Sequence, residues 1–115
     1  VTMVENSRSA YQSLLQNQTL LKAENCQILH SDALMYLANN TQKFDVIFCD
    51  PPYNKTWLNK LLPILNQYLN ADGVLYVEAE FAIQNDAIWQ LKKQDKAGNV
   101  YYHLLELNTC TKNEN

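Results

Sequence analysis

Residues 44–53 read FDVIFCDPPY. The first six, residues 44–49, are apolar except for Asp45, and an acid, two prolines and a tyrosine follow them. A short, almost wholly apolar run of this kind is typical of a strand that is buried on both faces of a parallel sheet. Proline fixes its own φ and holds the residue before it in extended geometry, so the turn after the strand should be stiff. The sequence therefore predicts that Asp50 is presented at the carboxyl end of a buried strand.

Alternating strand-like and helix-like segments surround this run. Further strands are expected over residues 1–5, 26–30, 74–78, 89–96 and 100–107, and helices are expected after the Asn6-Ser7 cap, from Ala33 to Ala38 and from Trp57 to Leu69. Pro63 should kink the last helix, and Asn70 to Gly73 should end it. Residues 80–87 match no pattern.

The order of these segments indicates the class of fold. Strands that alternate with helices imply a mostly parallel sheet with right-handed crossovers and helices on both faces. Ala97-Gly98-Asn99 is typical of a hairpin turn. We therefore expect an α/β fold, a Rossmann-like sheet with a C-terminal antiparallel hairpin, in one domain over residues 1–108 followed by a polar tail at 109–115.

Composition excludes several classes of protein. The 115 residues are 47% apolar and 18% charged, which is ordinary for a soluble globular chain, and no apolar stretch approaches the ~20 residues of a membrane span. A cytoplasmic location and no membrane partner are expected. The formal charge of -3 argues mildly against a chain that binds nucleic acid unaided. Cys26, Cys49 and Cys110 have neither disulfide nor zinc spacing, so no metal is expected.

Glycine is scarce in this chain. Gly73 and Gly98 are the only two, which excludes both a P-loop and a GxGxxG turn. The chain also opens on Val1 within an apolar alternation, without an initiator methionine. We therefore expect that it comes from the interior of a longer protein.

Acidic residues lie at the predicted strand ends, namely Glu5, Asp32, Asp50 and Glu78. Ligands of open α/β sheets bind beyond the carboxyl ends of the strands. Each acid taken alone is more simply explained as a cap of the following helix. Together they predict a ligand edge that is rich in hydrogen-bond acceptors.

Asp50, Pro51 and Tyr53 carry the most specific chemistry. The prolines leave the Pro51 carbonyl without a helical partner, so this carbonyl and the Asp50 carboxylate are two fixed acceptors beside an aromatic ring. An amino group on a planar ring stacked against Tyr53 would match them. The alternative is a rigid strand exit in which Tyr53 packs into the core.

Several segments together resemble a known family. DPPY after a buried strand resembles motif IV of the amino methyltransferases, which transfer a methyl group from S-adenosyl-L-methionine (SAM) to an exocyclic amine. The further segments are VTMVE at residues 1–5, NSRSAYQSLLQN at 6–17, SDAL at 31–34, LNADGVLYVEAE at 69–80 and KAGNVYYHLLEL at 96–107. With them the chain resembles the RsmD family, bacterial enzymes that methylate N2 of a guanine in small-subunit (16S) ribosomal RNA.

This resemblance implies roles for particular residues. Glu5 corresponds to the acid that binds the ribose hydroxyls of SAM, and Asp32 with Ala33 corresponds to the position that meets the adenine. Asp50 is implied both in the cofactor site and in catalysis. In catalysis the Asp50 carboxylate and the Pro51 carbonyl accept hydrogen bonds from the substrate amine.

The substrate side is implied in the same way. Tyr53 is counted as catalytic and, with Pro52, as part of the site that holds the base. Lys55 could meet an RNA phosphate, although a lysine on a helix face is more often simply solvated. Ribosomal RNA, or the small ribosomal subunit, is the implied partner.

The chain departs from the family in lacking its first strand and glycine-rich loop. The expected strand order is 3-2-1-4-5-7-6, so the central strand is missing and the chain is expected to be an N-terminally truncated fragment. Its second and fourth strands could pair directly, or the missing segment or another chain could fill the slot. Unpaired edges favour self-association. We expect this fragment to be inactive alone and to bind SAM weakly or not at all.

Three rival functions stay open at this point. Related motifs also serve adenine-N6 methylation and protein-glutamine methylation, and DPPY in place of NPPY argues moderately against glutamine. The third is a noncatalytic remnant or interaction module that kept the fold and lost the cofactor loop.

Overall fold

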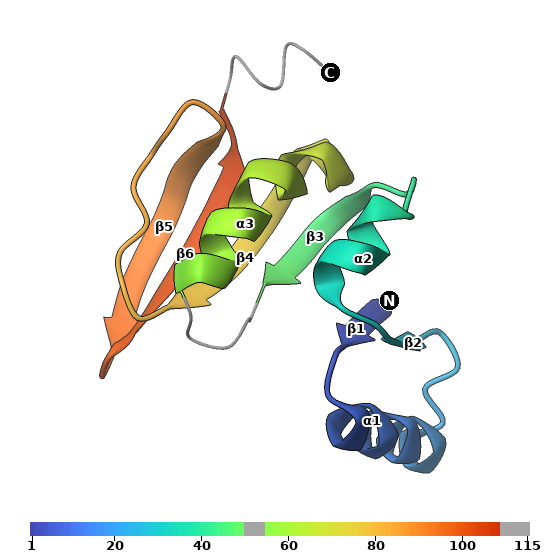
Figure 1. The fold of residues 1–115 in the computed structure, drawn as a ribbon. Coiled ribbons are helices and arrows are strands. Elements are labelled where there is room, and N and C mark those ends of the chain that lie inside the picture. Colours follow the sequence, from blue (N-terminus) through green and yellow to red (C-terminus); the bar gives the residue numbers. More distant parts are fainter. Residues whose placement is uncertain (50–54, 109–115) are drawn as a thin grey trace. The chain divides into compact units, whose positions relative to one another are not determined.

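The chain forms two compact units, Val1–Thr41 and Gln42–Asn115, and each contains its own sheet (Figure 1). The computed structural model describes residues 1–49 and 55–108, without the side chains of residues 55 and 56. The proposed site residues Asp50, Pro51, Pro52 and Tyr53 lie outside the described residues, as does the polar tail. The two units are described separately.

The first unit is a two-stranded parallel sheet with two helices. It contains β1 (Thr2–Glu5), α1 (Arg8–Leu21), β2 (Gln27–His30) and α2 (Ala33–Ala38). The register pairs Thr2 with Gln27 and Glu5 with His30, so both strands end at the same edge. Ser7 caps α1 by accepting the N–H of Ala10, as the Asn6-Ser7 signal predicts.

The second unit is a four-stranded sheet with one α-helix. It contains β3 (Phe44–Cys49), α3 (Lys55–Leu65), a 3-10 turn η1 (Asn66–Tyr68), β4 (Leu69–Ala79), β5 (Trp89–Ala97) and β6 (Val100–Leu107). The strand order is β3-β4-β6-β5. Because β6 is antiparallel to both β4 and β5 while β3 is parallel to β4, only β6 runs against the other three strands. Within each unit, the strand neighbours β1-β2 and β3-β4-β6-β5 match those that the expected family order predicts.

The core of the second unit lies between its sheet and α3, which crosses β4 and β6 in Figure 1. Alternate residues of the strands point toward this helix, as a pleated sheet requires. The buried side chains include Leu58, Leu61 and Leu65 of α3 and Leu75, Val77, Trp89, Leu105 and Leu107 of the strands. The Trp89 indole N–H donates to the carbonyl of Leu62 at 2.8 Å and so ties β5 to the helix.

The prediction that β3 is buried on both faces is wrong. Cys49 is its only buried residue, while Val46 is 49% exposed and Phe48 is 75% exposed. Among the described residues β3 pairs only with β4 and so forms the edge of its sheet, while α3 covers β4 and β6, so the side chains of β3 have little covering within this unit. An apolar run of this kind suits a strand with both faces covered, but within the second unit only one face of β3 is covered.

The predicted end of the third helix is also wrong. The helix ends at Leu65, two residues after Pro63, and Leu69 is the first residue of β4. Residues 70–73 belong to an irregular part of β4, since the pairing moves from Phe44 with Leu69 to Val46 with Val74. A Cβ on Gly73 would lie 2.9 Å from the carbonyl oxygen of Asp45. Gly73 is therefore required by close strand packing and does not terminate a helix.

The remaining segments connect and complete the sheet. The hairpin prediction is confirmed, with Gly98 at φ +61° in the turn between β5 and β6. Residues 80–88 form an irregular connection in which Asp86 Oδ1 accepts from the backbone N–H groups of Ile88 and Trp89 at 2.8 and 2.7 Å. Ile83 anchors the middle of this connection, because its side chain is buried.

Candidate active site

Glu5 lies at the carboxyl edge of the first unit. It is the last residue of β1, pairs with His30 and is half-buried. Its Oε1 accepts the N–H of Ser7 at 3.0 Å, and its carbonyl accepts the N–H of Ser31 at 3.0 Å. The other carboxylate oxygen, Oε2, accepts no hydrogen bond from the residues that the structure describes. The arrangement fixes one oxygen of Glu5 and presents a second acceptor, which suits a diol such as a ribose.

Asp32 begins the helix that follows β2. Its Oδ1 accepts the N–H groups of Leu34 at 2.9 Å and Met35 at 3.2 Å, so Asp32 is a helix cap, the simpler of the two predicted interpretations. The cap leaves other polar groups for a ligand. Within the described residues, Asp32 Oδ2 accepts no hydrogen bond and the Ala33 N–H donates none. An acceptor and a donor on neighbouring residues match the amino group and ring nitrogen along the edge of an adenine.

His30 supports this edge, and its partners are not evident from sequence. The His30 ring stacks on Tyr11 of α1, with centroids 5.1 Å apart and planes at 19°. Its Nε2 lies 3.1 Å from the carbonyl oxygen of Asn6, the residue after Glu5. His30 therefore links β2 to the β1-α1 turn that follows Glu5, which is a structural role.

The second unit presents its own edge at the end of β3. Cys49, the last residue of that strand, is buried, pairs with Val77 and directly precedes Asp50 in the sequence. Lys55 is the first residue of α3, and its side chain lies outside the described part of the structure. The strand that leads to the DPPY segment is thus fixed against β4 up to its final residue.

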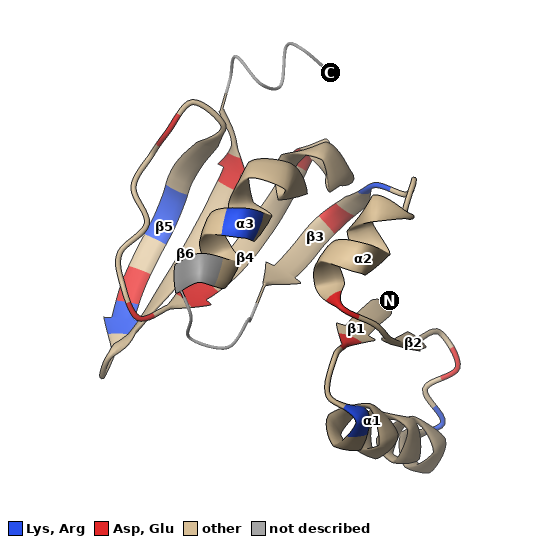
Figure 2. Ribbon diagram, viewed as in Figure 1, with Lys and Arg blue, Asp and Glu red and all other residues tan. Residues whose placement is uncertain are grey.

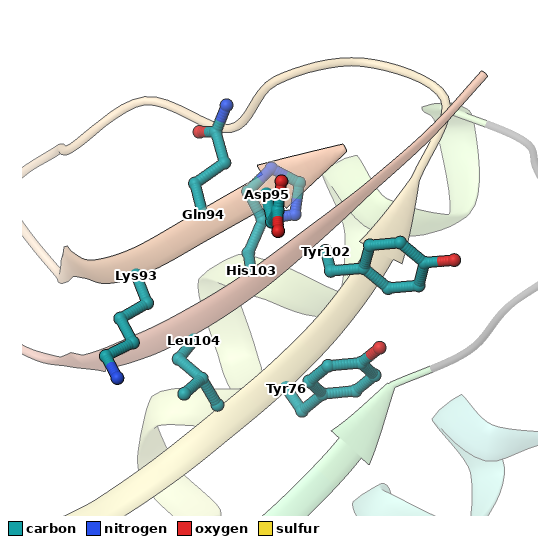
Figure 3. Close-up of a pocket in the computed structure, with 7 residues that line it drawn as sticks. All are labelled: Tyr76, Lys93, Gln94, Asp95, Tyr102, His103 and Leu104. Carbon is teal, nitrogen blue, oxygen red and sulfur yellow. The ribbon is translucent and has the colours of Figure 1, made fainter. Parts of the chain in front are cut away.

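An aromatic row crosses the face of this sheet opposite α3. Phe48 and Tyr76 have ring centroids 5.6 Å apart, and those of Tyr76 and Tyr102 are 6.4 Å apart. The Tyr76 hydroxyl donates to Oε1 of Glu78 at 2.9 Å, which gives this strand-end acid a structural partner. Tyr76 and Tyr102 line a pocket together with His103, Leu104 and residues of β5, and Figure 3 shows the two tyrosines on neighbouring strands. Sequence patterns predicted the strands but not this contact between them.

His103 is the buried histidine of the second unit. Its Nε2 accepts the N–H of Ile83 at 3.0 Å, and its Nδ1 lies 3.0 Å from the carbonyl oxygen of Val77. These bonds require the neutral ring with its proton on Nδ1. Burial lowers the pKa of His103 below 6.5, partly opposed by the hydrogen bond to Val77. The imidazole is a structural connector between β6, β4 and the 80–88 connection.

Charged residues of both signs are interspersed over the two units (Figure 2). In residues 1–49 and 55–108 no group of three or more His, Cys, Asp or Glu side chains could hold a metal ion. The helices of the same residues include none that is long and apolar enough to cross a membrane.

Comparison with known proteins gives the family. The model of the family described as Conserved hypothetical protein 95 matches residues 1–106. A curated relative from Escherichia coli (strain K12), named Ribosomal RNA small subunit methyltransferase D, is 31% identical over 112 residues, which cover 91% of this chain and 56% of the relative. The chain thus spans little more than half the length of that relative.

Solved structures give the same fold. The Escherichia coli protein YhhF has a TM-score of 0.83 and 30% identity, over 93% of this chain and 62% of that one. PKMT2 from Rickettsia typhi, solved with AdoHcy, has a TM-score of 0.58 and 24% identity over 67% of this chain and 15% of that chain, a likeness of fold alone. The fold is that of the class I SAM-dependent methyltransferases. The chain belongs to the Conserved hypothetical protein 95 family, which confirms the predicted resemblance to the RsmD family.

Proposed function

We propose that the protein encoded by the complete reading frame containing these residues, called here the full encoded protein, methylates N2 of a guanine in small-subunit ribosomal RNA with SAM as donor. One observation carries the proposal: a family match over residues 1–106, with curated relatives named as small-subunit ribosomal RNA methyltransferases. The strand that precedes Asp50 adds support, because it ends beside β4 at the carboxyl edge where ligands of such sheets bind.

The substrate half of the site is built from the DPPY segment. A guanine leaves its stack and lies against the Tyr53 ring, with Pro52 as a rigid apolar neighbour. The Asp50 carboxylate and the Pro51 carbonyl each accept one hydrogen of the N2 amine. Both bonds draw the nitrogen toward tetrahedral geometry, which frees its lone pair for in-line attack. Catalysis is then mostly positioning and electrostatic stabilisation.

The bond changes balance without a further reactant. SAM supplies a methyl group that is already activated by its positive sulfur. The N2 nitrogen forms a bond to the methyl carbon as the carbon–sulfur bond breaks, and the electron pair of that bond stays on sulfur. The nitrogen then loses one proton, and the Asp50 carboxylate is the acceptor already in hydrogen-bond contact with it.

The first unit fits the nucleoside part of SAM. Glu5 Oε1 already accepts the N–H of Ser7, which leaves Oε2 for the ribose hydroxyls. Asp32 Oδ1 already accepts the N–H groups of Leu34 and Met35, which leaves Oδ2, with the Ala33 N–H, for the adenine edge. Asp50 completes the proposed set on the methyl side. Glu5, Asp32 and Ala33 bind and orient the donor and take no part in the proton transfer, in which Asp50 is the acceptor.

The test is a comparison of Asp50→Ala with Asp45→Asn in the full encoded protein. Both acids belong to the FDVIFCDPPY segment, but Asp45 is exposed and accepts from Asn70 at 2.7 Å. Transfer of labelled methyl to 30S subunits should fall at least about 100-fold in Asp50→Ala and by less than about threefold in Asp45→Asn. SAM affinity, measured by titration calorimetry, should change little in either variant. Wild-type turnover by Asp50→Ala would remove the role assigned to this carboxylate.

The same calorimetry applied to residues 1–115 separates an enzyme from a noncatalytic module. We expect these residues alone to bind SAM weakly or not at all and the full encoded protein to bind it. Failure of both to bind would favour the interaction module, and micromolar binding by residues 1–115 would show that they hold a working donor site.

A further inference from the structure

A second polar hollow lies at the end of the β5-β6 hairpin. It has a volume of about 280 Å³ and is lined by Glu80, Lys96, Asn99 and Tyr101. Three of the four residues carry charged or amide groups, so the lining suits a polar ligand. None of these residues belongs to the site proposed above.

Strand register places the hollow at the same edge of the sheet as the end of β3. Cys49 pairs with Val77, and two residues further along β4 Ala79 pairs with Tyr101 of β6. Tyr101 in turn pairs with Lys96 of β5. Tyr101 is two strands from β3, a lateral separation of about 10 Å. In Figure 1 the hairpin turn lies at the end toward which the β3 and β4 arrows point. A ligand longer than one nucleotide could therefore reach both places.

The ammonium group in this hollow has a defined position. Lys96 Nζ lies 5.0 Å from the centroid of the Tyr101 ring, a cation–π contact. Tyr101 stacks in turn on His103, with centroids 6.3 Å apart, and His103 is 1% exposed and held by two hydrogen bonds. Because buried His103 positions the Tyr101 ring and this ring contacts Lys96, the position of the Lys96 ammonium group is limited.

The charged and amide side chains of the hollow have no hydrogen-bond or ion-pair partner among the described residues. Within residues 1–49 and 55–108, Lys96 forms no ion pair and the side chains of Glu80 and Asn99 form no hydrogen bonds. A cation, a carboxylate and an amide that face one hollow can bind a phosphate, a hydroxyl and a base edge at once. That set of groups suits a ribonucleotide better than a peptide, because a carboxylate that lines the same hollow as the cation can accept a hydrogen bond from a 2′-hydroxyl.

We propose that this hollow binds a nucleotide that flanks the methylated guanine in the RNA substrate. Lys96 contacts its phosphate, Glu80 accepts a hydrogen bond from its 2′-hydroxyl, and Asn99 contacts the sugar or the base edge. The inference rests on the proposed function and deepens it. Lys96 is a substrate-positioning residue and takes no part in the chemical step.

The test compares Lys96→Ala with Lys92→Ala and Lys96→Arg in the full encoded protein. Lys92 is an exposed lysine of the same strand that does not line the hollow. Fluorescence anisotropy with a labelled 16S ribosomal RNA fragment should give about three- to tenfold weaker binding for Lys96→Ala. The slope of log affinity against log salt should decrease in magnitude by about 0.7 to 0.9. Lys92→Ala should match wild type, and Lys96→Arg should restore most of the affinity.

Turnover separates this inference from the function on which it rests. In methyl-transfer assays Lys96→Ala should raise KM for RNA by the same factor and leave kcat unchanged. If Lys96→Ala and Lys92→Ala weaken RNA binding equally, the subsite is wrong even when methyl transfer occurs. If the wild-type protein binds RNA without transferring methyl, the proposed reaction is wrong while the anisotropy series still decides the subsite. Failure of the wild-type protein to bind the RNA would overturn both.

Discussion

Replacing His103 with leucine should destabilise the second unit in a manner that depends on pH. The wild-type imidazole is 1% exposed, accepts the Ile83 N–H at 3.0 Å and contacts the Val77 carbonyl oxygen at 3.0 Å. Leucine has a similar size but no polar atoms, so the buried Ile83 N–H would lose its partner.

The magnitude follows from these two contacts. Each hydrogen bond contributes about 1 kcal/mol net, and an unpaired buried N–H costs about 1 to 3 kcal/mol. The added apolar burial of leucine offsets about 1 to 2 kcal/mol. His103→Leu should therefore lower the free energy of unfolding by about 2 kcal/mol at neutral pH. The urea midpoint of the full chain should fall by about 1 M.

The sign of the pH effect follows from the lowered pKa of His103. Above pH 6.5, the ordinary value, the ring is neutral in both the folded and the unfolded chain, and its contribution is fully present. As the pH falls below 6.5, the unfolded chain takes up the proton first, so the contribution declines and is lost as the pH passes through the folded pKa. The wild-type chain should therefore lose stability more steeply with falling pH than His103→Leu.

The measurement is urea unfolding followed by circular dichroism between pH 5 and 8. Gln94→Ala is the matched control, because Gln94 is the exposed residue paired with His103 across β5 and β6, and it should change stability by less than about 0.5 kcal/mol. Equal midpoints for wild type and His103→Leu, or parallel pH dependences of the two, would refute the reasoning.

Two further predictions concern the strands around β3. Gly73→Ala should lower the free energy of unfolding by about 1 to 3 kcal/mol. The reason is that its Cβ would lie 2.7 Å from Leu69 Cδ1 and 2.9 Å from the Asp45 carbonyl oxygen. An unchanged urea midpoint would contradict this packing. Residues 1–115 should self-associate through the exposed edge strand β3, and Phe48→Lys should reduce that association in analytical ultracentrifugation, because Phe48 is 75% exposed. A wild-type chain that stays monomeric at every concentration tested would contradict the second prediction.

Most elements could be predicted from sequence because their signals are local. The Asn6-Ser7 cap and the turn at Gly98 act over a few residues, and each appears in the structure at or near the expected place. The family resemblance added the strand order, which local patterns cannot supply. Asp32 illustrates a signal with two meanings, since a helix cap and a ligand-binding acid require the same residue at the same position.

The failures have a different origin. The burial of β3 depends on which elements pack beside it and over its faces, and an apolar run does not report them. The wrong helix end arose because the spacing of Leu65 and Leu69 continues a helical period, while close packing of Gly73 against Asp45 requires a strand. The Tyr11–His30 stack, the Tyr76–Tyr102 pair and the Lys96 hollow join segments distant in sequence, so no local pattern could predict them.

We propose that the DPPY segment serves methylation of a guanine amine in small-subunit ribosomal RNA. To test this, the full encoded protein is incubated with SAM and unmethylated 30S subunits, the RNA is digested, and the methylated nucleoside is identified by mass spectrometry. We expect N2-methylguanosine, formed by the wild-type protein and absent with Asp50→Ala. N6-methyladenosine, or a methylated protein with unmodified RNA, would contradict it.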